Sequence, residues 1–164
     1  MVLVSMIASL ISVFAALVAA VASPGSAPSP TVAPLGSGWV PVPLEGVGEY
    51  ARYIRHENDG TDSLLSAGRQ VCDCQPDDAM HTLQSIFGRM KSVSVRRDVV
   101  EACGHTADRM LVTGLAATAS SRRNTEVLMF RGDGALYSLT YTFRYPAPMS
   151  DAESALLTLC GGAH

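Results

Sequence analysis

The sequence predicts a domain of the α+β class. Residues 76–90 and roughly 151–160 carry apolar side chains at the three- and four-residue spacing of amphipathic helices. Residues 135–145 instead alternate apolar and polar side chains with a period of two, which indicates a half-buried β-strand. An Asp-Gly pair joins this strand to an apolar segment before it, and such a pair is typical of an antiparallel hairpin.

The first 22 residues contain no charged side chain and end in Ala-Val-Ala, a pattern that signal peptidase cleaves. The change to Ser-Pro-Gly-Ser directly afterwards also favours cleavage. The apolar segment is longer than the core of a usual signal peptide, and its one positive charge is the α-amino group, which fits an uncleaved membrane anchor instead. We therefore expect residues 1–22 to be a signal peptide, with a single-pass N-terminal anchor as the alternative.

Residues 23–38 are rich in Pro, Ser, Ala and Gly and lack bulky apolar side chains, so we expect a disordered linker there. The remaining residues, 39–164, begin at the single tryptophan and have the size of one domain. The chain has a formal net charge of −3 and dispersed basic residues, which argues against binding to nucleic acid. We expect the basic doublets Arg96-Arg97 and Arg122-Arg123 to lie on solvated faces or in loops.

All four cysteines follow the N-terminal apolar segment. In an exported protein this even number indicates two disulfide bonds, for which three connectivities exist. Cys72 and Cys74 could instead bind a metal ion with His81 and His105, but structural zinc sites prefer two residues between paired thiolates, and only Asp73 separates these two. We expect no metal ion and no cofactor. A bond between Cys72 and Cys74 is awkward if both lie in a strand, because their side chains would leave the same face at an unsuitable separation.

Residues 39–60 start with an extended stretch interrupted by prolines. The spacing of Tyr50, Tyr53 and Ile54 then favours a helical turn over a strand. Asn58-Asp59-Gly60 predicts a turn. The sequence LLSAGRQVCDC predicts a strand that ends at Pro76.

The helix predicted for residues 76–90 has strong start signals. Pro76 suits the first helical position, and Asp77 and Asp78 follow where the helix dipole favours negative charge. From Ser92 the period changes to two, and residues 92–101 predict a strand that continues past a kink.

Cys103-Gly104-His105 predicts a tight connection to a further strand. The segment LAATASSRRN predicts a mobile connection. The last hairpin contains Arg131-Gly132-Asp133, a tripeptide that some extracellular ligands present to integrins. We interpret it as a turn, because the flanking glycines tolerate the positive φ that a tight turn requires. After the hairpin, Ser150 and Glu153 form a capping box that opens the predicted C-terminal helix.

The order of these elements resembles the PsbP-like α/β/α sandwich family, most strongly in the C-terminal half of the chain. Residues 99–114 look like that family's step from a strand through a glycine turn to the next strand, and residues 126–143 look like its closing hairpin. The chain is also similar to small exported bacterial proteins of this class in which a Cys-Gly turn occurs together with a C-terminal Leu-Cys, here Cys103-Gly104 and Leu159-Cys160. The resemblance implies an antiparallel β-sheet packed between helices.

The same resemblance implies a disulfide bond between Cys103 and Cys160, which would tie the last helix to a turn between two strands. The pairing of Cys72 and Cys74 stays open. The resemblance also implies an accessory or binding role, because known members are photosystem lumenal subunits, partner-binding proteins and envelope lipoproteins that handle lipid (LpqN-type). Such proteins share a fold but no common active site, so the fold alone does not supply a function.

We therefore expect an exported, disulfide-containing, non-enzymatic module, secreted or periplasmic, that binds an apolar small molecule or a protein partner. The alternative is a membrane-tethered structural or interaction protein of the envelope. A deep apolar cavity between the helix at 76–90 and the sheet would favour a small molecule, whereas a filled core with an exposed apolar patch would favour a protein.

We expect no enzymatic activity, because the chain contains none of the common catalytic motifs, such as G-x-S-x-G, a P-loop or H-E-x-x-H. The best acid–base pairs are His56 with Glu57 and His105 with Asp108, and we interpret both as turn residues. A cluster of His, Asp and Ser converging in a cleft would instead indicate catalysis.

Overall fold

A computed structural model describes residues 38–116, 122–144, 156 and 159–160. The predicted signal peptide and nearly all of the predicted linker lie outside the described residues, as do the capping box and most of the predicted C-terminal helix.

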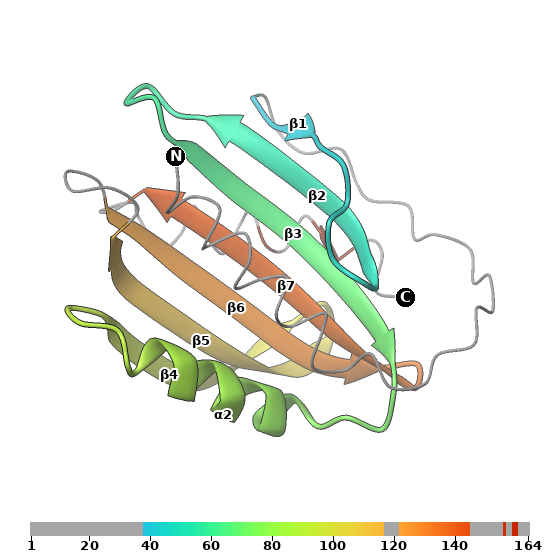
Figure 1. Ribbon diagram of the computed structural model, residues 1–164. Helices are drawn as coiled ribbons and strands as arrows, with labels where there is room; N and C mark the ends of the chain where they lie inside the picture. Colours follow the sequence, from blue (N-terminus) through green and yellow to red (C-terminus); the bar gives the residue numbers. More distant parts are fainter. Residues whose placement is uncertain (1–37, 117–121, 145–155, 157–158, 161–164) are drawn as a thin grey trace.

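The described chain forms one antiparallel sheet (Figure 1). The order of its strands across the sheet is β1-β2-β3-β7-β6-β5-β4. The strands are β1 (Val40–Pro41), β2 (Glu49–His56), β3 (Asp62–Val71), β4 (Ser94–Ala102), β5 (His105–Ala116), β6 (Arg122–Gly132) and β7 (Ala135–Arg144). The helix α2 (Pro76–Phe87) connects β3, in the first half of the sheet, to β4 at its far edge.

The predicted fold class is wrong. Of the described residues, 59% lie in strands and 14% in helices, so the domain is mostly a seven-stranded sheet with one short helix and is not an α+β sandwich between helices. Residues 49–56 account for part of the difference, because they form β2 and not the expected helical turn. The helical spacing of their aromatic side chains is overridden by pairing with β3, which sets Tyr53 opposite Leu65.

The prediction of α2 is confirmed, although the helix ends at Phe87 and not at residue 90. Pro76 occupies its first turn together with Asp77 and Asp78. Gly88 is the C-terminal cap; its N–H donates to the carbonyl oxygen of Gln84, and the N–H of Arg89 donates to that of Ile86.

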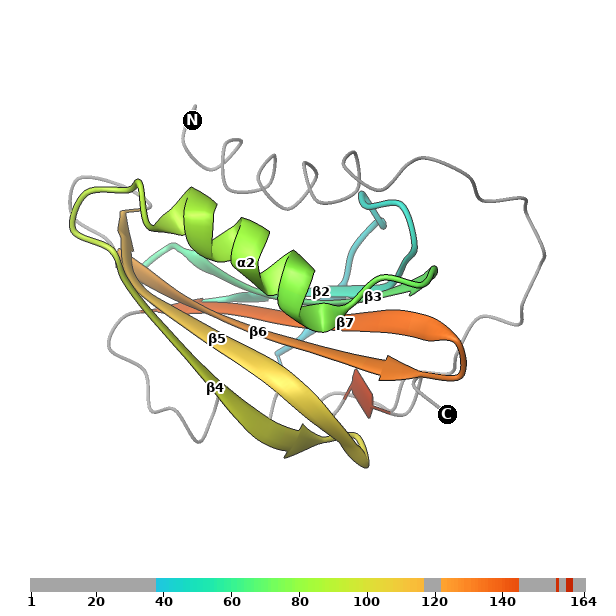
Figure 2. The same cartoon turned by 90° about the horizontal axis from the view of Figure 1, so that it is seen from below.

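Figure 2 shows α2 on one face of the sheet, which we call the helix face. Residues of the described C-terminal part pack against the opposite face, which we call the C-terminal face. On the helix face, buried side chains of α2 meet buried side chains of the strands: Met80, Leu83 and Phe87 with Met110, Val112, Leu115, Val127, Met129 and Leu136. On the C-terminal face, the buried core includes Leu65, Leu128, Phe130, Tyr137, Leu139, Tyr141, Phe143, Leu156 and Leu159.

Both tight turns predicted around glycine are confirmed. Cys103 and Gly104 have φ of 54° and 75° and connect β4 to β5 with no further loop residue. Asp133 and Gly134 have φ of 48° and 70° and connect β6 to β7 in the same way. Two successive positive φ angles define the turn whose twist matches that of a hairpin.

Candidate interaction site at the sheet edge

The sequence offered two histidine–carboxylate pairs, His56 with Glu57 and His105 with Asp108, and in the structure the members of each pair contact different partners. His56 contacts Asp62, with 2.6 Å between Nδ1 and Oδ1, whereas Glu57 accepts hydrogen bonds from Arg55 and Ser63. His56 is exposed at the end of β2, near a turn and not in a cleft.

His105 and Asp108 are three residues apart in β5, so their side chains leave opposite faces of the sheet. His105 stacks on Phe130 on the C-terminal face, with 5.1 Å between ring centroids. Asp108 lies on the helix face, where its carboxylate is 3.5 Å from Nη2 of Arg97.

The cysteines lie in two disulfide bonds. Cys103 is joined to Cys160, with 5.1 Å between Cα atoms, and Cys72 is joined to Cys74, with 5.2 Å. The strand expected to continue to Pro76 ends at Val71, and the chain bends at Cys72 and Asp73. The objection to a bond between two strand residues therefore does not apply. Within the described part of the chain, no group of three or more His, Cys, Asp or Glu side chains is arranged to hold a metal ion.

Arg131 of the Arg-Gly-Asp tripeptide holds the loop closed by the Cys72–Cys74 bond. Its Nη1 donates to the carbonyl oxygen of Cys72 at 3.2 Å and to that of Cys74 at 2.7 Å. The same nitrogen lies 3.5 Å from the carboxylate of Asp73. The side chain of Arg131 thus crosses from the β6–β7 hairpin to the end of β3, and it serves an internal contact.

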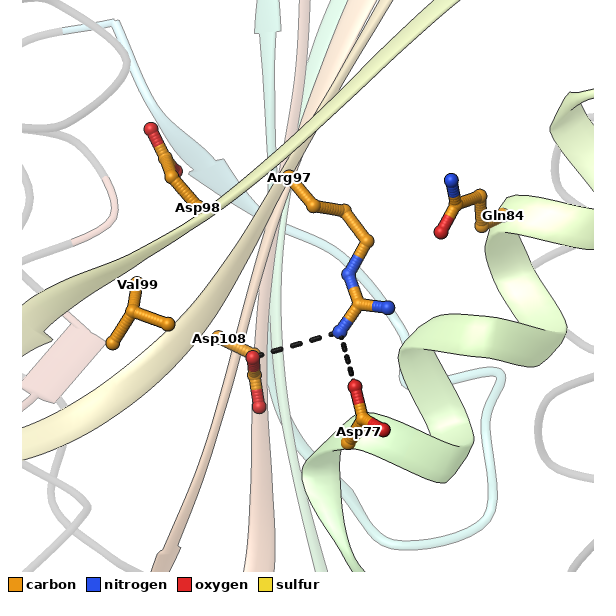
Figure 3. A pocket seen from close by; sticks show the side chains of 6 residues that line it. All are labelled: Asp77, Gln84, Arg97, Asp98, Val99 and Asp108. Carbon is orange, nitrogen blue, oxygen red and sulfur yellow. Dashed lines mark hydrogen bonds and ion pairs between the residues drawn. The ribbon is translucent and has the colours of Figure 1, made fainter.

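A shallow, open groove of about 370 Å³ lies between α2 and β4 on the helix face (Figure 3). Its lining residues are Asp77, Gln84, Arg97, Asp98, Val99 and Asp108. Nη2 of Arg97 reaches from β4 to Asp77 of α2 at 2.7 Å and to Asp108 of β5 at 3.5 Å. The hydrogen bond from Arg97 holds the pKa of the Asp77 carboxyl below its usual value.

A second ion pair connects β4 to β5 on the C-terminal face. Arg109 binds both carboxylate oxygens of Asp98, at 2.7 and 2.6 Å, and this hydrogen bonding lowers the pKa of Asp98. Nη1 of Arg109 also lies 3.9 Å from Glu126, whose side chain is fully buried. These contacts fix β4 to its neighbour from both faces.

The sequence did not indicate the contacts of Arg97 or the burial of Arg123. Arg97 and Arg123 were expected to be solvated, yet Arg97 bridges α2 and β5, and Arg123 is only 4% exposed in β6. Burial lowers the pKa of Arg123. The alternation of β4 could have placed Arg97 on the same face as Val95, but only the position of α2 makes it a bridge.

The two edges of the sheet differ. β1 contains two residues, one of them Pro41, which has no N–H to donate. β4 contains nine residues, and in the described part of the chain no strand pairs with its outer edge. Val99, near the middle of β4, is 64% exposed and belongs to the groove lining. β4 is therefore the long open edge of this sheet.

The fold is similar to that seen in the crystal structure of LpqN, a protein involved in cell envelope biogenesis of Mycobacterium tuberculosis. The TM-score is 0.53, the sequence identity is 12%, and the match covers 76% of this chain and 78% of LpqN. At this identity the likeness shows a shared fold. Protein-family models and curated proteins gave no match to the sequence. Membership of the PsbP-like family is thus not confirmed.

Proposed function

We propose that this protein is an exported, non-enzymatic module of the cell envelope that binds a protein partner along the open edge of β4. The observation that carries the proposal is the combination of a nine-residue edge strand, whose outer side pairs with no described strand, with an exposed valine beside a charged groove. Strand edges of this kind add a further strand from a partner through backbone hydrogen bonds.

An extracytoplasmic location is supported by the two disulfide bonds, which persist in oxidising compartments, and by the fold shared with an envelope protein. Among the described residues, no helix has the length and apolarity required to cross a membrane. The tethered alternative depends on whether residues 1–22 are retained.

A protein partner is favoured over an apolar small molecule because the space between α2 and the sheet is filled. Met80, Leu83 and Phe87 are at most 9% exposed and pack directly on buried side chains of the sheet. The groove between α2 and β4 lies at the outer side of α2 and is lined mainly by charged and polar groups. Binding of an apolar molecule requires an apolar cavity, whereas a flat edge with an apolar centre suits a protein surface.

The test is photo-crosslinking in the native host, with a photoreactive amino acid placed at Val99. The control carries the same group at Val47, which is 80% exposed in the loop between β1 and β2. We expect covalent protein adducts from position 99 and few from position 47. Equal adducts at both positions, or none at position 99, would contradict the proposal.

A further inference from the structure

The turn between β4 and β5 determines which backbone groups of β4 face outward. In a hairpin with a two-residue turn, the residues flanking the turn exchange both backbone hydrogen bonds, here Ala102 and His105. Hydrogen-bonded pairs then recur at every second residue along the ladder. The intervening residues of β4 turn their N–H and C=O groups to the open edge: Val95, Arg97, Val99 and Glu101.

We propose that the partner at this edge is a second copy of this chain, whose β4 pairs antiparallel with the first β4 about a two-fold axis at Val99. This inference rests on the proposed function and names the partner of the same site. A two-fold axis perpendicular to the sheet extends it continuously from one copy into the other, with the helix faces on the same side.

The charges of β4 favour one register. With the axis at Arg97 or at Asp98, two identical charges lie directly opposite one another, which is destabilising. With the axis at Val99, the two valines meet at the centre, and Arg97 of each copy lies opposite Glu101 of the other. This register also pairs Asp98 with Val100, so no like charges face each other near the axis.

The side chains at the edge are placed for this pairing. Val99 is 64% exposed, so a second copy removes apolar surface from water. Both described contacts of Arg97, to Asp77 and to Asp108, use Nη2, so no described contact occupies Nε or Nη1. The side chain of Glu101 is exposed on its own chain.

The opposite edge of the sheet explains why such pairing would stop at two copies. β1 is two residues long and contains Pro41, so it presents little backbone for a further strand. One long edge and one blunted edge favour a closed pair through β4 over an open filament.

The test uses charge at the two-fold axis. Val99→Lys places two ammonium groups opposite each other, and Val99→Asp places two carboxylates there. We expect sedimentation velocity to show a concentration-dependent dimer for the wild-type protein and a dissociation constant raised by about tenfold or more for each variant alone. An equal mixture of the two variants should associate again, because lysine then faces aspartate. Val47→Lys, in an exposed loop, is the matched control and should leave association unchanged.

Circular dichroism of each variant establishes that it is folded, and the recovery in the mixture shows this independently. A wild-type protein that stays monomeric at every concentration would overturn the inference, as would Val99→Lys associating like the wild type. Two monomeric variants that do not associate when mixed would overturn the Val99 register. If wild type is monomeric while photo-crosslinks at Val99 join a different protein, self-pairing fails and the proposed function stands.

Discussion

At the scale of single residues, Arg131 belongs to a tripeptide known from adhesion ligands, but its side chain makes an internal structural contact. The tripeptide Arg-Gly-Asp occurs at a hairpin, as the sequence predicts, and Asp133 and Gly134 adopt the positive φ of that turn. The arginine, however, donates to two carbonyl oxygens of the Cys72–Cys74 loop. The hairpin follows from local residue preferences. The contacts of Arg131 reach back 59 positions to Cys72 and 57 positions to Cys74, so they could not be predicted from the local sequence.

Replacing Arg131 by methionine should therefore destabilise the protein. The variant keeps the length of the side chain but loses two charge-assisted hydrogen bonds, so we expect the free energy of unfolding to fall by about 1–3 kcal/mol. Urea denaturation measures this change. Arg89→Met is the control, because Arg89 is exposed just after α2 and its side chain makes no described contact. Equal losses in the two variants would contradict the bracing role of Arg131.

Two buried arginines should respond in opposite ways to the same substitution. Arg52 is 7% exposed and forms ion pairs with Glu45 at 3.0 Å and Glu49 at 3.3 Å. Arg52→Met leaves the buried carboxylate of Glu49 without its cationic partner, although two backbone N–H groups still donate to it, and should cost about 2–4 kcal/mol of unfolding free energy. Nη1 of Arg123 is buried without a hydrogen-bond partner in the described part of the chain, so Arg123→Met should change stability little or raise it. Thermal and urea unfolding of both variants would show the contrast; a larger loss for Arg123→Met would contradict it.

At the scale of secondary structure, the elements with local signals were predictable and the others were not. α2 begins at a proline followed by two aspartates and ends at a glycine, and these signals act within the helix itself. β2 lacks such signals, and its strand conformation depends on pairing with β3. The candidate site was not predictable for the same reason. Its groove exists because α2 carries the chain to the far edge of the sheet, where Arg97 meets Asp77.

The ion pair that joins β4 to β5 predicts a dependence of stability on acid. Because Arg109 lowers the pKa of Asp98, the ionised carboxylate stabilises the folded protein above its unfolded pKa of about 4. That stability is lost as the pH falls through the lower folded pKa. Asp98→Asn should be less stable than wild type at neutral pH and should lose less stability on acidification. Urea unfolding over a series of pH values measures both.

The control for the acid prediction is Asp133→Asn, at the exposed tip of the β6–β7 hairpin, where asparagine tolerates the positive φ. It should follow the acid profile of the wild type. A profile for Asp98→Asn that stays parallel to the wild-type profile at every pH would show that Asp98 does not contribute as described.

At the scale of the whole molecule, the sheet is larger than the sequence indicated, because residues 49–56 form β2 and extend the sheet beyond β3. The chain connects its distant parts by a disulfide bond between Cys103, at the β4–β5 turn, and Cys160, which lies 57 residues later. Leu156 and Leu159 are fully buried on the C-terminal face close to this bond in the sequence. The bond therefore holds the C-terminal residues against the core.

Removing this bond should have a large effect on stability. A closed loop of this length lowers the entropy of the unfolded chain, which contributes about 4 kcal/mol to the free energy of unfolding. We expect Cys103→Ser with Cys160→Ser to lose a free energy of that order, and Cys72→Ser with Cys74→Ser to lose clearly less, because its loop is three residues long. Urea denaturation under non-reducing conditions, with peptide mapping of the bonds, compares them. Equal losses would contradict the assignment.

The central claim is that the open edge of β4 pairs with a second copy, and amide hydrogen exchange tests it most directly. In dilute protein, the outward-facing amides of Val95, Arg97, Val99 and Glu101 should exchange rapidly. As the concentration rises, those of Arg97, Val99 and Glu101 should slow together, because these residues lie opposite β4 of the second copy, while the amides of Leu44 and Val47 in the exposed β1–β2 loop stay unchanged. Edge amides that exchange equally fast at every concentration would contradict the claim.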